Sequence, residues 1–269
     1  MSLLKIDKLT IRAGGQALVK DMSLTIEPGA RVGLIGESGS GKSLTAFAAV
    51  GLLPQGLEAK GSILLDGVEV VGAPEETLRP LRGSAAAFVF QEPLTALDPL
   101  MKIGRQVAEP IARRRRREGK SAKRSEIVAE VRHYLERVAL PDIDRIMNSY
   151  PFQISGGQRQ RVAIAMALAC RPKLLIADEP TTALDVTTQA EILELLSTLV
   201  REEGMALLFI SHDLPVVAKV VEEVTVLRRG EIVEQGPVRT VFGSPQHEYT
   251  KMLVNAAAAF DRALGEPVQ

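Results

Sequence analysis

The chain has 269 residues, a quarter of them charged, and its 33 basic side chains balance 33 acidic ones. This length suits one large domain with a subdomain, or two small domains, and the balanced charge predicts no nucleic acid partner. A single cysteine, Cys170, excludes an internal disulfide framework, and no apolar run reaches the roughly 18 residues that span a bilayer. We therefore expect a cytosolic protein whose role at any membrane depends on partner subunits.

The N-terminal part of the chain reads mainly as strands. Apolar runs bounded by glycine, proline and aspartate predict strands or hairpins at 3–11, 22–26, 31–35, 62–70 and 85–90. A glycine-rich loop follows the third of these runs. The alanine- and leucine-rich segment 42–53 then predicts a helix.

The composition changes after Gln91, because the residues from about 103 to 140 are heavily charged and their pattern predicts helix. Beyond it, helices and strands alternate, with helices expected at 158–169 and 188–203 and strands at 174–177 and 206–210. Such alternation predicts an α/β fold with a mostly parallel sheet covered by helices. A hairpin at 228–235 and a short helical tail are expected to close the chain.

The glycine-rich loop matches the phosphate-binding loop pattern in full, between a buried strand and the start of a helix. Its glycines let backbone N–H groups turn toward phosphate oxygens, and the lysine adds a positive charge. The residues expected to bind nucleotide are Gly36, Glu37, Ser38, Gly39, Ser40, Gly41, Lys42, Ser43 and Leu44. The Ser43 hydroxyl is also a candidate ligand for Mg²⁺.

A second acidic motif narrows the choice among phosphate-loop proteins. The apolar run 173–177 ends in two adjacent carboxylates, Asp178 and Glu179. The first is expected beside Mg²⁺, and the second could polarise a water that attacks the terminal phosphate of ATP.

The segment Ile154-Ser155-Gly156-Gly157-Gln158 resembles the signature motif of ATP-binding cassette proteins, with isoleucine in place of the usual leucine. The resemblance implies a RecA-like P-loop NTPase core with an antiparallel β-subdomain and a helical insertion. The expected boundaries are 1–258 for the domain, about 94–156 for the insertion and 259–269 for the tail. It also implies that Ser155, Gly156, Gly157 and Gln158 close on the ATP held by an opposite subunit.

Three further positions resemble family motifs in the expected order. Gln91 matches the Q-loop glutamine, which would approach Mg²⁺ and the attacking water, and Ala183-Leu184-Asp185 matches the D-loop at the dimer interface. His212 matches the switch histidine that contacts the γ-phosphate. The resemblance thus implies catalysis by Glu179, His212, Gln91 and Lys42. It implies Mg²⁺ ligation by Ser43, Gln91 and, through water, Asp178.

One motif departs from the family pattern. The family stacks adenine on an aromatic residue near the start of the chain, but the matching stretch 11–16 contains no aromatic residue. This leaves Arg12, an aliphatic side chain or only a weak contact with this stretch to support the base, so we expect loose selectivity between ATP and GTP.

The segments 90–99, 165–172, 177–187 and 244–253 resemble the ATPases of oligopeptide, dipeptide and nickel importers, and specifically the first of their two paired ATPases. This implies a heterodimer with a homologous ATPase, docked on two membrane permeases that an extracytoplasmic solute-binding protein supplies. The expected location is the cytoplasmic face of the bacterial inner membrane. A nickel importer subunit and a soluble cassette ATPase, such as a carbon–phosphorus lyase accessory subunit, remain alternatives.

Two features outside these motifs favour structural roles. The run Arg113 to Arg117 is bordered by glutamates and lacks interleaved aromatics, so we expect a solvated helix face or loop, with acidic lipid as the alternative. Cys170 lies among alanines and leucines and is expected in the core. Because no cysteine follows it, we expect no iron–sulfur cluster.

Overall fold

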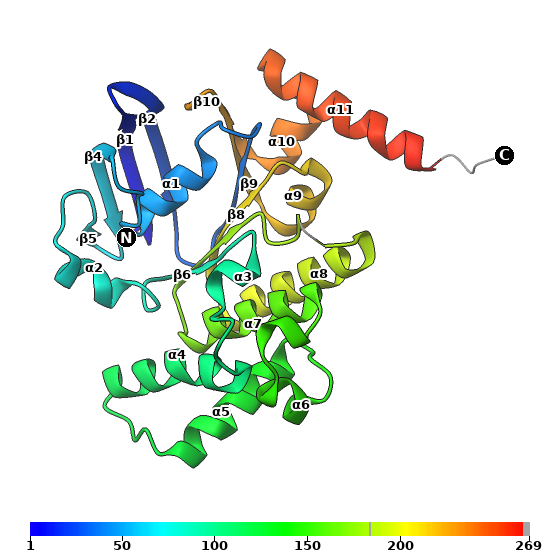
Figure 1. Ribbon diagram of the computed structural model, residues 1–269. Helices are drawn as coiled ribbons and strands as arrows, with labels where there is room; N and C mark the ends of the chain where they lie inside the picture. The colour runs from blue at the N-terminus through cyan, green and yellow to red at the C-terminus, as the bar shows by residue number, and fades with distance from the viewer. Residues whose placement is uncertain (183, 266–269) are drawn as a thin grey trace. The chain divides into compact units, whose positions relative to one another are not determined.

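The computed structural model of the chain describes residues 1–182 and 184–265, which form two compact units (Figure 1). The first unit combines Met1–Arg79 with the chain from Ala206 onward, and the second is Pro80–Met205. The helix α2 (Glu75–Leu81) lies where the chain passes from the first unit into the second.

One sheet of the first unit is antiparallel, with strand order β2-β1-β4-β5. Its strands are β1 (Leu4–Ala13), β2 (Gln16–Ile26), β4 (Leu57–Leu65) and β5 (Val68–Glu69). Gly14 and Gly15 have positive φ angles of 52° and 89°, as a two-residue hairpin turn between right-twisted strands requires. The hairpin predicted at 62–70 is confirmed as β4 and β5.

Four more strands of the first unit follow in the order β10-β9-β3-β8. They are β3 (Arg31–Ile35), β8 (Ala206–Ser211), β9 (Glu223–Arg228) and β10 (Glu231–Pro237). Strand β3 runs parallel to β8 and to β9, and β10 returns antiparallel to β9 in the predicted closing hairpin. Every residue of β8 is buried, which explains why it reads as a continuous apolar run.

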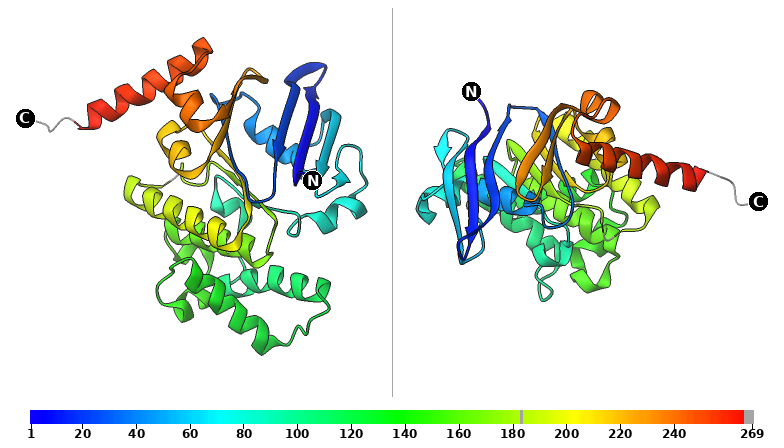
Figure 2. Two further views of the ribbon diagram at one scale, coloured as in Figure 1. Left: turned by 180° about the vertical axis from the view of Figure 1, so that it is seen from behind. Right: turned by 90° about the horizontal axis from the view of Figure 1, so that it is seen from above.

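Four helices accompany these strands. They are α1 (Lys42–Ala49), α9 (Leu214–Val220), α10 (Val238–Gly243) and α11 (Glu248–Gly265). The last helix begins near α10 and extends away from it in all views (Figures 1 and 2).

The second unit pairs two parallel strands, β6 (Ala86–Val89) and β7 (Leu174–Asp178), and is otherwise helical. Its helices are α3 (Pro93–Ala96), α4 (Ile103–Arg117), α5 (Arg124–Arg137), α6 (Ile143–Asn148), the 3₁₀ turn η1 (Pro151–Gln153), α7 (Gly156–Ala169) and α8 (Val186–Glu203).

The predicted α/β class, with parallel strands and covering helices, is confirmed. The helix predicted at 42–53 is shorter than expected. It ends at Ala49, because Val50 leaves helical geometry and Gly51 adopts a positive φ of 65°. The strand predicted at 22–26 begins earlier, at Gln16, where the hairpin turn ends.

Candidate functional site

The phosphate-binding loop joins β3 to α1, and two of its glycines are required by their surroundings. A Cβ at Gly36 would lie 2.1 Å from the Leu227 carbonyl oxygen, and Gly36 has φ near +152°. A Cβ at Gly41, the N-cap of α1 with φ near +102°, would lie 2.7 Å from Val19 Cγ2. A side chain at either position would push the loop off the strands behind it, so its tight turn depends on glycine.

Polar groups inside the loop suit an anion. The buried Lys42 side chain donates from Nζ to the backbone oxygens of Gly36, at 2.9 Å, and Glu37, at 3.0 Å. Ser40 is 1% exposed, and its Oγ has no hydrogen-bond partner among the described residues. A buried hydroxyl without a partner is costly, and a phosphate oxygen would satisfy it. Ser43 and Leu44 are half-buried in the first turn of α1.

Backbone hydrogen bonds brace the outside of this loop. The Gly230 N–H donates to the Ser40 carbonyl oxygen at 3.1 Å, and the Gly230 carbonyl accepts from Lys20 N–H at 2.8 Å. The Glu37 N–H donates to the Tyr249 hydroxyl at 2.9 Å. Tyr249 is absent from the residues that the sequence singles out as a site, because it lies in the C-terminal helix, far along the chain from the loop.

His212 follows β8 directly, at the same edge as the phosphate-binding loop. Strands β3 and β8 are parallel, and Ile35 is paired with Ser211, so Gly36 and His212 are the first residues beyond paired strand ends. The carboxyl edge of parallel strands is where α/β proteins bind ligands. Asp213 then caps α9 by accepting from Val216 N–H at 3.2 Å, which fixes the turn that carries the exposed His212.

In the second unit, the two carboxylates and the glutamine follow a pair of parallel strands. Val89 pairs with Ala177, so Gln91 and Glu179 occupy matching positions beyond β6 and β7. Gln91 Nε2 lies 3.5 Å from Glu179 Oε2, which also accepts from the Thr182 hydroxyl at 3.0 Å. Glu179 has a left-handed φ of 46°. Such backbone conformations cost free energy and cluster at functional positions.

The first carboxylate of this pair, Asp178, is the last residue of β7 and is 6% exposed. The half-buried Glu179 follows it on the turn. The two neighbouring carboxylates therefore differ in burial, and Asp178 is the more enclosed of the two.

The signature segment forms the start of α7. Ser155 Oγ accepts from Gln158 N–H at 3.2 Å, and Gln158 Oε1 accepts from Ser155 N–H at 3.0 Å, a reciprocal capping box. Gly157 lies against α8, since a Cβ there would be 2.6 Å from Thr188 Cγ2. At Gly156 a Cβ would meet Leu184 at an ordinary 3.6 Å. Packing within this chain therefore requires only the second of the two glycines.

Asp185 caps α8 by accepting from Thr188 N–H at 3.0 Å. That backbone hydrogen bond is the main reason why the pKa of Asp185 lies below its ordinary value. Leu184 is half-buried beside it, and Ala183, the first D-loop residue, lies outside the described residues. The structure thus gives Asp185 a local role that does not depend on a second subunit.

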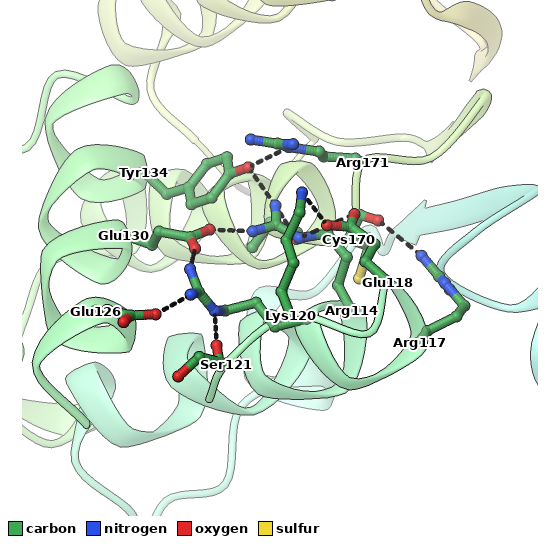
Figure 3. Close-up of polar contacts among 12 residues, drawn as sticks. Arg114, Arg117, Glu118, Lys120, Ser121, Glu126, Glu130, Tyr134, Cys170 and Arg171 are labelled. Carbon is green, nitrogen blue, oxygen red and sulfur yellow. Dashed lines mark hydrogen bonds and ion pairs between the residues drawn. The ribbon is translucent and has the colours of Figure 1, made fainter. Parts of the chain in front are cut away.

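The arginine run is neither a loop nor a uniformly solvated face, which corrects the expectation from sequence. Arg114 donates to the hydroxyl of Tyr134, at 2.7 Å, and the two side chains lie together in Figure 3. Arg114 also donates to the Ala169 carbonyl oxygen, at 3.1 Å. Arg114 also pairs with Glu130, and Arg115 pairs with Glu130 and with a second glutamate of α5. Arg114 is 3% exposed, so this network joins α4, α5 and the end of α7 from within.

The spacing of residues on α4 accounts for this burial. Ile103, Val107, Ile111 and Arg114 recur at intervals of four, four and three, which place them on one buried helix face. Burial alone would raise the pKa of Glu130, but hydrogen bonds and charge from Arg115 and Arg114 hold it below the usual 4.5. The sequence therefore carried a signal for the buried arginine in its helical period.

Cys170 lies just beyond α7 and is partly exposed, rather than fully in the core as expected. Its Sγ lies 3.5 Å from the Met166 carbonyl oxygen. Burial raises the pKa of the thiol, although nearby arginine charges oppose this. The thiol is therefore protonated at neutral pH.

The stretch that departs from the family's adenine motif forms the β1–β2 turn. The exposed Arg12 donates to the Gly15 carbonyl oxygen at 3.2 Å, so its guanidinium is held along its own hairpin. Val19 and Leu18 of β2 pass close to Gly41 of the phosphate-binding loop. This hairpin and the phosphate-binding loop are thus neighbours.

The first unit thus offers polar hydrogen-bonding groups in the phosphate-binding loop, and the second unit offers a carboxylate held by its neighbours. No helix within 1–182 and 184–265 is long and apolar enough to cross a membrane. Over the same residues, no cluster of three or more histidine, cysteine, aspartate or glutamate side chains could hold a metal ion.

The chain is similar in sequence and in fold to proteins of a known family. Residues 19–182 match the ABC transporter family. A Brucella ovis protein provisionally named a peptide import ATP-binding protein is 46% identical over 91% of this chain and 73% of its own length. The glutathione import ATP-binding protein GsiA of Pectobacterium atrosepticum is 44% identical over 93% of this chain, which spans 40% of that relative. The dimeric ATP-binding cassette MJ0796, solved with ADP and phosphate, has a TM-score of 0.77 and 30% identity, covering 88% of this chain and 99% of its own.

Proposed function

Since the chain belongs to the ABC transporter family and is an ATP-binding cassette ATPase, we propose that it powers the uptake of oligopeptides, dipeptides or a related small solute. The 46% identity with the Brucella ovis protein named for peptide import is the observation that carries this choice. The Pectobacterium atrosepticum relative supports it, because glutathione is itself a tripeptide.

The proposed site binds ATP through the loop Gly36–Ser43 and the first turn of α1. Backbone N–H groups and the positive end of α1 would face the phosphates, and Lys42, while still donating to its loop carbonyl partners, would place its positive charge against the phosphate oxygens. The buried, unpartnered Ser40 hydroxyl supports this, since it provides a polar atom within the loop for a phosphate oxygen.

We assign the hydrolytic step to Glu179. Its carboxylate would orient or deprotonate the water that attacks the γ-phosphate, while Gln91 and Thr182 hold the carboxylate in place. His212 would stabilise charge on the transferring phosphate.

Magnesium ion, when bound with ATP, would neutralise charge on the β- and γ-phosphates. Its proposed ligands are Ser43, Gln91 and, through water, Asp178. These groups fit, because each offers a hard oxygen donor and Mg²⁺ usually keeps waters and substrate phosphates as its remaining ligands. A preformed cluster of carboxylates is not needed for such a site.

The signature segment Ser155–Gln158 is proposed to close on ATP held by a second cassette. The capped start of α7, which is 14 residues long, supports this role, because helix N-termini favour anions. The partner is proposed to be a homologous ATPase, with Asp185 at the interface. ATP would bind both cassettes best when they are closed, so it would favour that state.

The coupling partners follow from the family as proposals. They are two integral membrane permeases and an extracytoplasmic solute-binding protein, with this chain at the cytoplasmic face of the inner membrane. We also propose that residues 1–258 form one ATP-binding cassette domain, with a helical insertion at about 94–156 and a short tail at 259–269.

Uptake by cells tests the solute class. Cells in which this chain carries Glu179→Gln should lose uptake of a labelled tripeptide, whereas Glu194→Gln, a change at an exposed position of α8, should retain it. Loss of nickel uptake with normal tripeptide uptake would point to the nickel alternative. Unchanged uptake of both would contradict a transport role and favour a soluble cassette ATPase.

A further inference from the structure

The peptide group between Gly36 and Glu37 is held at both of its polar ends. Its carbonyl oxygen accepts from Lys42 Nζ at 2.9 Å, and its N–H donates to the Tyr249 hydroxyl at 2.9 Å. The C=O and N–H of a trans peptide lie in one plane and point in opposite directions. Tyr249 therefore fixes the orientation of the same peptide plane on which the Lys42 ammonium rests.

The Tyr249 ring is itself tightly constrained. Tyr249 is 3% exposed, and the Arg228 guanidinium lies over its ring at 4.9 Å from the centroid. Arg228 is the last residue of β9, directly after Leu227, whose carbonyl oxygen crowds Gly36. The end of β9 therefore contacts both the Tyr249 ring, through Arg228, and Gly36, through Leu227.

The segment that leads to Tyr249 is anchored on β10. Glu234 accepts the backbone N–H groups of Gln246, at 2.9 Å, and His247, at 3.1 Å. His247 Nδ1 then accepts the Tyr249 N–H at 3.1 Å. One carboxylate and one imidazole therefore hold the start of α11, so that the hydroxyl reaches the phosphate-binding loop.

From these contacts we infer that Tyr249 is a positioning residue for the nucleotide site. Its hydroxyl holds the Gly36–Glu37 peptide in the orientation from which Lys42 reaches the phosphates, and thereby ties the C-terminal segment Ser244–Thr250 to nucleotide binding. The inference rests on the phosphate-binding role proposed for Gly36–Ser43. It adds a group that touches neither the nucleotide nor the attacking water.

Without the hydroxyl, the Gly36–Glu37 peptide is free to rotate, because glycine tolerates a wide range of backbone angles. A flip exchanges the directions of the C=O and the N–H, so Lys42 loses the Gly36 carbonyl oxygen as an acceptor. A single hydrogen bond of this kind corresponds to about a 3- to 10-fold change in an equilibrium constant.

The test measures the dissociation constant of MgADP for the purified full chain. Tyr249→Phe removes only the hydroxyl and keeps the ring under Arg228. Tyr134→Phe is the matched control, because it removes another buried phenol hydroxyl, bonded to Arg114 in the second unit. We expect MgADP to bind about 3- to 10-fold more weakly to Tyr249→Phe and within about twofold of wild type to Tyr134→Phe.

A double-mutant cycle with Lys42→Ala separates positioning from general destabilisation. If Tyr249 acts through Lys42, adding Tyr249→Phe to Lys42→Ala should change MgADP affinity by less than about twofold. Glu234→Ala, which releases the anchor but keeps the hydroxyl, should weaken binding in the same direction.

Three results would overturn the inference, and they are distinguishable. Unchanged affinity in Tyr249→Phe would show that the hydroxyl has no role. An equal loss with and without Lys42 would show that it does not act through the lysine. Wild-type affinity in Lys42→Ala would instead remove the proposed phosphate-binding role on which the inference rests.

Discussion

Gly157→Ala should lower the free energy of unfolding of the isolated chain, because the added methyl group overpacks the contact between α7 and α8. The new Cβ would lie 2.6 Å from Thr188 Cγ2, about 1 Å inside ordinary carbon–carbon contact. Rotating Thr188 away is costly, because its side chain hydrogen-bonds Asp185 at the start of α8 and its χ1 has few allowed positions in a helix. A contact this short corresponds to the upper part of the ~1–3 kcal/mol cost of overpacking. The better helix propensity of alanine offsets at most about 1 kcal/mol, so the net loss of unfolding free energy should be about 1–2 kcal/mol.

Thr188→Ser provides the matched rescue, since it deletes Cγ2 and keeps the hydroxyl and the backbone N–H that Asp185 accepts. Thermal unfolding of the isolated chain should show a Tm lower by roughly 2–8 °C for Gly157→Ala. The double variant should return to within about 2 °C of Thr188→Ser alone. An unchanged Tm in Gly157→Ala, or a double variant no better than Gly157→Ala, would refute the packing argument.

Gly36→Ala should lower the free energy of unfolding, measured with denaturant, by at least about 2 kcal/mol more than Gly39→Ala. The new Cβ at position 36 would lie 2.1 Å from the Leu227 carbonyl oxygen, whereas nothing lies within 4 Å of a Cβ at position 39. Equal losses would contradict this. The lowered pKa of Glu130 stabilises the fold above its unfolded value of 4.5, and this contribution is lost as pH falls through the folded pKa. The Tm difference between wild type and Glu130→Gln should therefore shrink below about pH 4.5; a constant difference would argue against the ion pairs. Cys170 should react with iodoacetamide at pH 8 much more slowly in the native than in the unfolded chain, since burial raises the thiol pKa. Equal rates would count against that burial.

The phosphate-binding loop could be predicted from sequence because its determinants are local. Glycines at Gly36 and Gly41 lie between a buried strand and a helix, and the structure shows steric reasons for both. The capping box at Ser155 and Gln158 is equally local, since both partners lie within one helical turn. Such patterns fix backbone geometry over a few residues, independently of the rest of the chain.

The contacts that the sequence did not predict join residues far apart in the chain. Tyr249 and Glu37 are 212 positions apart, and their hydrogen bond depends on how the start of α11 is held. The arginine run is intermediate, because the helical period points Arg114 inward, while its acceptors lie on α5 and at the end of α7. The charge of the run alone suggested that its side chains face solvent, whereas the position of Arg114 on the apolar face of α4 buries it.

The central claim is that Glu179 drives ATP hydrolysis in this chain, and ATP turnover by the assembled complex tests it most directly. The chain would be co-purified with its partner ATPase and permeases as wild type, Glu179→Gln and the surface control Glu194→Gln. We predict that Glu179→Gln abolishes turnover while ATP stays bound, and that the control matches wild type. Undiminished turnover by Glu179→Gln would contradict the assignment.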